Sequence, residues 1–244
     1  MQADLEEGLA RVLRRPVSLT VAGRTDAGVH ATGQVAHADL PRALWDEQHP
    51  RLVRRLRGVL PPDIAVSAVR EAPVDFDARF AALARHYVYR LTDDPAGPPP
   101  LRRADTVGWP RRLDGDAMAA AAATLVGRHD FAAYCRRRAG ATTIRTLLDL
   151  HVVRTQDLIE VAVSADAFCH SMVRSLVGAL TAVGERRRAV GWPASLLGAA
   201  VRSDEVPVVA PGGLTLVAVD YPPDDELAAR TLVTRALREP LPPS

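Results

Sequence analysis

Apolar residues recur at helical spacing in several stretches of the chain. Near its start, Leu5, Leu9 and Val12 recur every three to four residues and so fall on one side of a helix that ends before Pro16. In residues 171–186, apolar side chains would cover most of the surface of a helix, which is typical of a buried helix. The spacing predicts helices over residues 2–14, 42–58, 117–126, 171–186 and 224–237, and a short helix that begins at Pro193.

Other stretches alternate between apolar and polar residues, as strands do. Residues 85–91 alternate most sharply and place Tyr87, Tyr89 and Leu91 on one face. The pattern predicts further extended segments over residues 17–21, 34–37, 64–70, 148–152, 158–165 and 214–221. A turn at residues 155–157 would join two of them into a hairpin. Strands and helices are therefore mixed along the chain, which favours an α+β fold with a largely antiparallel sheet.

A proline-rich segment separates two parts of the chain. Residues 93–100 contain four prolines and one glycine, a composition typical of a linker. We therefore predict an N-terminal half over residues 1–100 and a C-terminal half over residues 101–244. The expected architecture is two mixed α/β halves around the largely antiparallel sheet.

Composition places the chain among globular proteins. The 244 residues are 48% hydrophobic and 25% charged, and no apolar run is long enough to span a membrane. The first residues lack the features of a secretion signal, so we predict a cytoplasmic protein that does not enter a membrane. The formal net charge is only +2, but the chain has arginines and no lysines, and local clusters of arginines lie at residues 51–57, 136–138 and 186–188. Each cluster is either a solvated face or an RNA contact.

Cysteine and histidine spacing gives no sign of a metal site. Cys135 and Cys169 form an isolated pair without metal-ligand spacing, and in a cytoplasmic chain we expect two buried thiols. His30 and His37 have no cysteine or carboxylate at the spacing of metal ligands. We therefore predict no metal.

The most informative stretch is Gly-Arg-Thr-Asp-Ala-Gly-Val-His-Ala at residues 23–31. It lies between two predicted strands and has a glycine on either side of Arg24, Thr25 and Asp26. Asp and Gly are ordinary turn residues, so part of this stretch could be a simple bend. An Arg and an Asp on such a loop, with His30 just beyond, also form a plausible reactive centre.

The whole string resembles the signature of the TruA family of tRNA pseudouridine synthases, position by position. Four further segments resemble later motifs of that family in the same order along the chain, at residues 78–89, 127–131, 168–178 and 210–216. Ser171 and His86 depart from the family pattern, at positions where we expect bulkier or more basic residues. The resemblance therefore covers nearly the whole chain.

The resemblance implies an isomerase that converts uridine to pseudouridine without any cofactor. The bond from C1′ to N1 breaks, the uracil rotates, and a new bond forms through C5. This requires a carboxylate near C1′, a group that takes the C5 proton, and a pocket for a base removed from its stack. By resemblance Asp26 is the carboxylate, either as a nucleophile at C1′ or as the group that removes a ribose proton.

A cation should pair with Asp26, because burial disfavours a charged carboxylate. By resemblance this cation is Arg174, which the pattern places on an apolar helix where an unpaired guanidinium is costly. An Arg that reaches solvent from the helix edge is the alternative. Tyr87 is either a core aromatic, which we expect of Tyr89, or the family tyrosine that stacks on uracil and relays the C5 proton.

Substrate contacts follow from the same motifs. Arg24 is a candidate to occupy the space that the flipped base leaves. Thr25, His30, Arg79 and Leu214 stand in the matching segments and are expected to bind substrate, as is Tyr87. The resemblance further implies an RNA-binding cleft between the halves, uridines at positions 38 to 40 of the tRNA anticodon arm as targets, and a homodimer.

The start of the chain leaves a second interpretation open. The family begins with a strand that carries Tyr-Asp-Gly and Gly-Trp-Gln elements, followed by Thr-Val-Gln, whereas Met1 and Gln2 stand here in place of Val-Gln. We expect that the natural protein, from a GC-rich bacterium, is longer than this sequence. In that case a GTG codon for valine was read as the start codon. Without that strand, a catalytically impaired tRNA-binding or folding-chaperone protein of the same fold is the alternative.

Overall fold

A computed structural model describes residues 1–136, 140, 142–199 and 201–235 of the chain. Contacts divide the chain into two compact units, and the backbone passes between them several times. Unit 1 contains residues 1–23, 35–82 and 222–234, and the described residues of unit 2 are 24–34, 83–221 and 235. The expected division into residues 1–100 and 101–244 stays a prediction, because units defined by contacts need not fold independently.

Unit 1 is built around two amphipathic helices. Its elements are α1 (Gln2–Leu13), β1 (Thr20–Val21), β3 (Ala36–His37), α2 (Arg42–Arg57), η4 (Asp224–Glu226) and α6 (Leu227–Arg235). Strands β1 and β3 pair antiparallel as a two-stranded sheet. Val12 and Leu13 of α1 pack with Leu52 and Leu56 of α2 in a small core, which also buries Val17. The helices predicted over residues 2–14 and 42–58 are confirmed, since their apolar stripes bury one another. The helix predicted over residues 224–237 is present as α6, and residues 236–237 lie outside the described residues.

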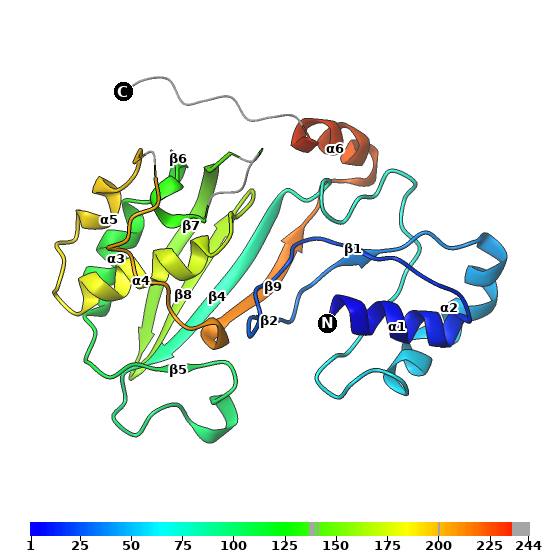
Figure 1. Cartoon of the computed structure of the whole chain (residues 1–244), viewed down its shortest axis with the longest axis horizontal. Helices are drawn as coiled ribbons and strands as arrows, with labels where there is room; N and C mark the ends of the chain where they lie inside the picture. Colours follow the sequence, from blue (N-terminus) through cyan, green and yellow to red (C-terminus); the bar gives the residue numbers. More distant parts are fainter. Residues whose placement is uncertain (137–139, 141, 200, 236–244) are drawn as a thin grey trace. The chain divides into compact units, whose positions relative to one another are not determined.

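Unit 2 contains a mixed seven-stranded sheet (Figure 1). Its strands are β2 (His30–Ala31), β4 (Ala84–Thr92), β5 (Val107–Gly108), β6 (Gly127–Asp130), β7 (Ile144–Thr155), β8 (Leu158–Ala165) and β9 (Leu214–Asp220). The order is β2-β9-β4-β8-β7-β6, with β5 paired to β4. β2 runs parallel to β9 and β5 parallel to β4, and the other pairs are antiparallel. The predicted α+β class is confirmed.

Helices pack with this sheet in one large core. They are α3 (Gly115–Ala123), α4 (Met172–Gly184) and α5 (Trp192–Ser195), with single 3-10 turns η1 (Pro100–Arg102), η2 (Ala132–Tyr134) and η3 (Pro211–Gly213). Nearly every residue of α4 is buried, as its apolar sequence predicts. Tyr89 and Leu91 of β4 are fully buried in the same core, so the alternation of that strand is confirmed.

Two expectations from the sequence are wrong, and two short strands were not predicted. Residues 64–70 form no strand, because the alternating residues have no ladder partner there. Residues 30–31 and 127–130 do form strands, although two to four residues are too few for a visible period. Cys135 and Cys169 are joined as a disulfide, with their Cα atoms 5.7 Å apart, so they are not two buried thiols. A Cα separation of this size is typical of bridged cysteines.

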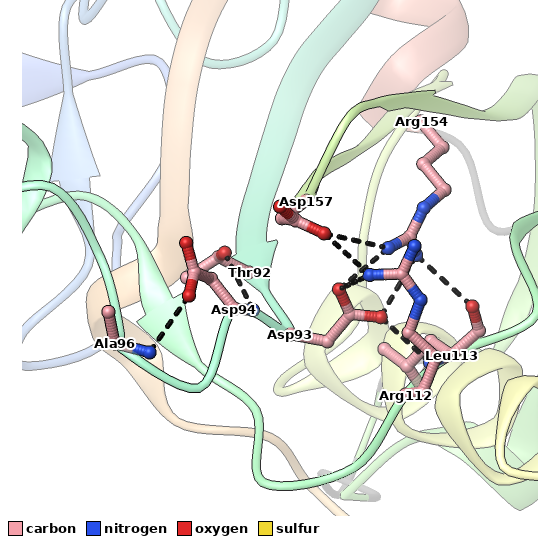
Figure 2. A network of polar contacts seen from close by, with 8 residues as sticks. All are labelled: Thr92, Asp93, Asp94, Ala96, Arg112, Leu113, Arg154 and Asp157. Atoms are coloured by element: carbon pink, nitrogen blue, oxygen red, sulfur yellow. Dashed lines mark hydrogen bonds and ion pairs between the residues drawn. The ribbon is translucent and has the colours of Figure 1, made fainter.

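A buried carboxylate ties the end of β4 to the β7–β8 hairpin and to the segment before α3 (Figure 2). Asp93 accepts hydrogen bonds from Arg154 Nη1 and Nη2 at 3.0 and 2.7 Å, from Arg112 Nη1 at 3.1 Å, and from the Leu113 N–H at 2.8 Å. Arg112 also pairs with Asp157 in the hairpin turn. Burial alone would raise the pKa of Asp93, but the bonds from Arg154 and Leu113 outweigh it and lower that pKa.

Among the residues that the structure describes, no helix is both long and apolar enough to cross a membrane.

Candidate active site

The loop that carries Asp26 is held at the edge of the unit 2 sheet. A turn follows Asp26, in which the Val29 N–H donates to the Asp26 carbonyl at 3.0 Å. Gly28 in this turn has φ +80°, a conformation that a residue with a Cβ rarely adopts, and an added Cβ would lie 3.0 Å from Pro211 Cγ. Immediately after the turn, β2 pairs with β9. Gly28 therefore serves a tight turn docked on the sheet.

Arg174 reaches Asp26 from the first turn of α4. Its Nη1 lies 3.2 Å from Asp26 Oδ2, and its Nε donates to the Val209 carbonyl at 2.7 Å. The Arg174 side chain is 18% exposed and that of Asp26 30% exposed. The predicted ion pair is confirmed. A fork with both of its arms on Asp26 would be the strongest arrangement, but the guanidinium divides between the carboxylate and Val209.

The position of Arg174 on its helix is unfavourable without such a partner. The N-terminal turn of a helix carries a partial positive charge, which repels a cation. α4 begins at Met172, so Arg174 lies within this turn. The carboxylate of Asp26 offsets this repulsion. The presence of an arginine at position 174 is therefore explained by its pairing with Asp26 and not by the stability of the helix.

A residue that the sequence analysis did not select also faces Asp26. His170 Nε2 lies 3.4 Å from Asp26 Oδ1, the oxygen that Arg174 does not contact. The signal that could have found it is spacing, because His170 precedes Arg174 by four residues at the entry to the same helix. Each carboxylate oxygen of Asp26 thus has its own nitrogen partner.

Tyr87 belongs to the same electrostatic environment. It lies on β4, is 8% exposed, and meets Phe168 edge to face with ring centroids 5.2 Å apart. Burial raises the pKa of Tyr87 to about 12, the charge of Arg85 opposes this, and the charge of Asp26 adds to it. The phenol is therefore protonated at neutral pH. Phe168 is a second residue that sequence reasoning missed, since one partly buried aromatic gives no pattern.

Tyr89 is a core residue, as expected. It is fully buried, and its hydroxyl donates to the Ala210 carbonyl at 2.9 Å. Burial raises the pKa of this phenol as well. Leu214, predicted to bind substrate, pairs with Tyr89 across β9 and β4 and is 6% exposed. Gly213 before it has no room for a Cβ, which would lie 2.6 Å from the Arg90 carbonyl oxygen.

The other predicted substrate residues lie at different places. Arg24 is exposed and Thr25 is partly buried, directly before Asp26 on the loop. His30 Nε2 lies 2.7 Å from the Ala104 carbonyl oxygen, so its ring ties β2 to the segment before β5. Arg79 belongs to unit 1, where its guanidinium lies over the Phe80 ring. The substrate roles of all four stay predictions.

Comparisons with known proteins show which family the chain belongs to. A family model described as "tRNA pseudouridine synthase" matches residues 121–222, which include the whole of α4 and of β9. The protein from Frankia casuarinae named "tRNA pseudouridine synthase A" is 61% identical over 246 residues, which cover 100% of this chain and 89% of that protein. Proteins of the same name from Streptomyces griseus and Mycobacterium leprae are 53% and 51% identical, over 98% and 97% of this chain and 85% and 86% of theirs. With identity this high over nearly the whole chain, the protein belongs to the tRNA pseudouridine synthase A family.

Proposed function

We propose that this protein isomerises uridine to pseudouridine in tRNA, with Asp26 as the carboxylate at C1′. The observation that supports it most is the contact of Arg174 Nη1 with Asp26 Oδ2, because it stabilises a negative charge on a carboxylate that is still 30% exposed. The exposed remainder of Asp26 is accessible to a ribose. A protein that only bound tRNA would gain nothing from this pair, since a carboxylate repels phosphate.

In this mechanism Asp26 acts at the ribose, and two routes remain open. As a nucleophile it attacks C1′ while the bond to N1 breaks; as a base it removes a ribose proton before that bond breaks. In both routes the freed uracil turns until C5 faces C1′ and the new bond forms. C1′ releases Asp26 in the first route, and the ribose regains its proton in the second. The C5 proton must then leave while N1 gains one. The product has the same atoms as the substrate, so no cofactor enters.

Tyr87 is proposed to serve the proton transfer at C5. A phenol with its pKa raised to about 12 is not a ready base at neutral pH, because it holds its own proton. It can still relay a proton by accepting one at oxygen while it passes its own to a neighbouring group or water. The edge-to-face contact with Phe168 holds the Tyr87 ring in one orientation. A ring held in this way is better suited to stack on a uracil base than a ring that moves freely.

The finer parts of the proposal come from the family resemblance. They are uridines at positions 38 to 40 as targets, an RNA-binding cleft between two halves, a homodimer, and action in the cytoplasm. Replacing the uridines at these positions with cytidine in a transcript tests the target. Light scattering of the purified protein tests the dimer.

The activity is tested with a tRNA transcript labelled with tritium at C5 of uridine. Isomerisation releases the label to water, so the protein should release it, and Asp26→Asn should not. Asp26→Asn should bind the same transcript with nearly the same affinity, because the exchange removes a charge without changing size. No release by the protein, or equal release by Asp26→Asn, would contradict the proposal.

A further inference from the structure

The carboxylate of Asp26 has one oxygen that the proposed ion pair does not hold. Arg174 contacts Oδ2 alone, and its Nε is used on the Val209 carbonyl. Rotation of an aspartate carboxylate about its last torsion is soft and roughly two-fold. A single contact therefore fixes one oxygen but leaves the plane of the carboxylate poorly determined. His170 Nε2, 3.4 Å from Oδ1, lies where a second contact would fix that plane.

The other ring nitrogen of His170 is also engaged. Its Nδ1 lies 3.0 Å from the Ser171 hydroxyl oxygen. The Asp26 carboxylate can only accept, so a neutral ring that bonds to it carries its proton on Nε2, and its Nδ1 then accepts from the Ser171 hydroxyl. When the ring is charged, both nitrogens carry protons and the hydroxyl accepts. In either state Nε2 carries a proton and lies 3.4 Å from Oδ1, so it can serve as the donor to that oxygen.

The backbone around His170 is held from both sides. The Arg136 N–H donates to the His170 carbonyl at 3.2 Å, and the preceding Cys169 is joined to Cys135. Ser171 has φ 65°, in the left-handed region that a residue other than glycine rarely occupies. Backbone strain of this kind persists only where the surroundings hold it. The ring therefore approaches Asp26 from a fixed base rather than from a mobile loop.

We propose that His170 is a positioning residue for Asp26, and that the Ser171 hydroxyl supports the form of its ring with the proton on Nε2. The inference rests on the proposed function. His170 holds Oδ1 as Arg174 holds Oδ2, so that the plane of the carboxylate is set before the ribose arrives. A positioning role predicts that loss of the ring lowers kcat far more than it weakens tRNA binding, because binding does not use the orientation of this carboxylate.

The first test compares two replacements of His170. His170→Leu removes the donor and should lower kcat about 10-fold to 100-fold, with the Kd for tRNA within about threefold of wild type. His170→Gln keeps an N–H donor at about the reach of Nε2 and should recover most of the lost rate. His151→Leu is the matched control, because His151 faces the carboxylate of Asp149 on the exposed side of β7, outside the site.

A second test does not need activity. In protein labelled with ¹⁵N at histidine, the neutral ring of His170 should show its proton on Nε2, with the resonance assigned by its loss in His170→Gln. Ser171→Gly keeps the left-handed backbone but removes the hydroxyl, and it should shift the population toward a proton on Nδ1.

These outcomes separate the inference from the proposed function. If the wild-type protein releases no tritium, the proposed function fails while the tautomer measurement still stands. If the protein is active but His170→Leu has wild-type kcat, or His170→Gln is as slow as His170→Leu, His170 does not position Asp26. A neutral ring with its proton on Nδ1 in the wild-type protein would overturn the role of Ser171.

Discussion

Arg174 contacts Asp26 with one nitrogen of its guanidinium and keeps another for the Val209 carbonyl. The distances are 3.2 Å from Nη1 to Oδ2 and 2.7 Å from Nε to the carbonyl oxygen. The peptide N–H of Val209 donates in turn to the Arg174 carbonyl at 3.3 Å. The planar fork therefore links the carboxylate to the segment that leads into η3 and β9, and through β9 to the strand that follows the Asp26 loop.

Arg174→Lys should be severely impaired although the charge is kept. A lysine ammonium is a compact point charge and cannot contact Asp26 and the Val209 carbonyl in the same fixed geometry. We expect kcat to fall about 10-fold to 100-fold, with tRNA affinity changed by less than about threefold. Arg186→Lys is the control, because Arg186 is an exposed arginine paired with Asp114 away from the site. Equal rates for Arg174→Lys and wild type would show that the reaction does not depend on the planar guanidinium of Arg174.

Tyr87→Phe should slow isomerisation about tenfold or more and largely preserve tRNA binding, because the ring remains and the hydroxyl is lost. The pKa of Tyr87 is raised to about 12, so its phenol stays protonated well above neutral pH. The rate of the wild-type protein should therefore not rise near pH 10, the usual pKa of tyrosine. Its pH dependence in this range should match that of the Phe variant. Tritium release across this pH range checks both statements. A rise near pH 10 that Tyr87→Phe abolishes would mean that the tyrosine acts as an ionised base.

Asp93→Asn should destabilise the fold without a direct effect on the chemistry. The amide cannot balance the two arginines that converge on the buried carboxylate, and breaking such a network costs about 3 kcal/mol. The pKa of Asp93 is lowered in the folded state, so its stabilisation is present above the unfolded value near 4 and is lost as pH falls through the folded value.

Urea unfolding of wild type and Asp93→Asn at several pH values measures this. The difference in unfolding free energy should be constant above about pH 5 and shrink below about pH 4. Asp94→Asn is the matched control, since its carboxylate accepts from the Ala96 N–H (Figure 2) and, among the residues that the structure describes, has no ion pair with an arginine. A difference that grows toward low pH would contradict the assigned network.

The C-terminal half of α2 should contribute to tRNA affinity. Arg51, Arg54 and Arg57 are exposed there, and no carboxylate is found paired with them within the described part of the chain. Changing all three to Gln should weaken tRNA binding and flatten its dependence on salt, by about 0.7 to 0.9 in log–log slope for each phosphate that is no longer neutralised.

A control variant removes the same number of charges elsewhere. Arg102, Arg186 and Arg188 each pair with a carboxylate, so changing them to Gln removes arginines that are already neutralised locally. Binding measured at several salt concentrations compares the two variants. An equal change in slope for both would assign the effect to net charge rather than to α2.

The amino-acid sequence by itself determined most of the elements and the identity of the motif. Helical and alternating spacing report burial on one face, and burial is what stabilises α1, α2, α4 and β4. The string around Asp26 and its partner on α4 were recognisable by their resemblance to the motifs of the family. The ion pair between Asp26 and Arg174 spans 148 positions of the chain and was predictable only through the resemblance.

Tertiary structure alone decided the rest. Residues 30–31 became a strand because β9 offered free backbone groups beside them, whereas residues 64–70 alternate but have no such partner. The contact of His170 with Asp26 and the division of the Arg174 fork depend on which backbone and side-chain groups meet in space. Periodicity reports only how a segment divides between core and solvent, and it carries no information about the partner that satisfies a hydrogen bond or a charge.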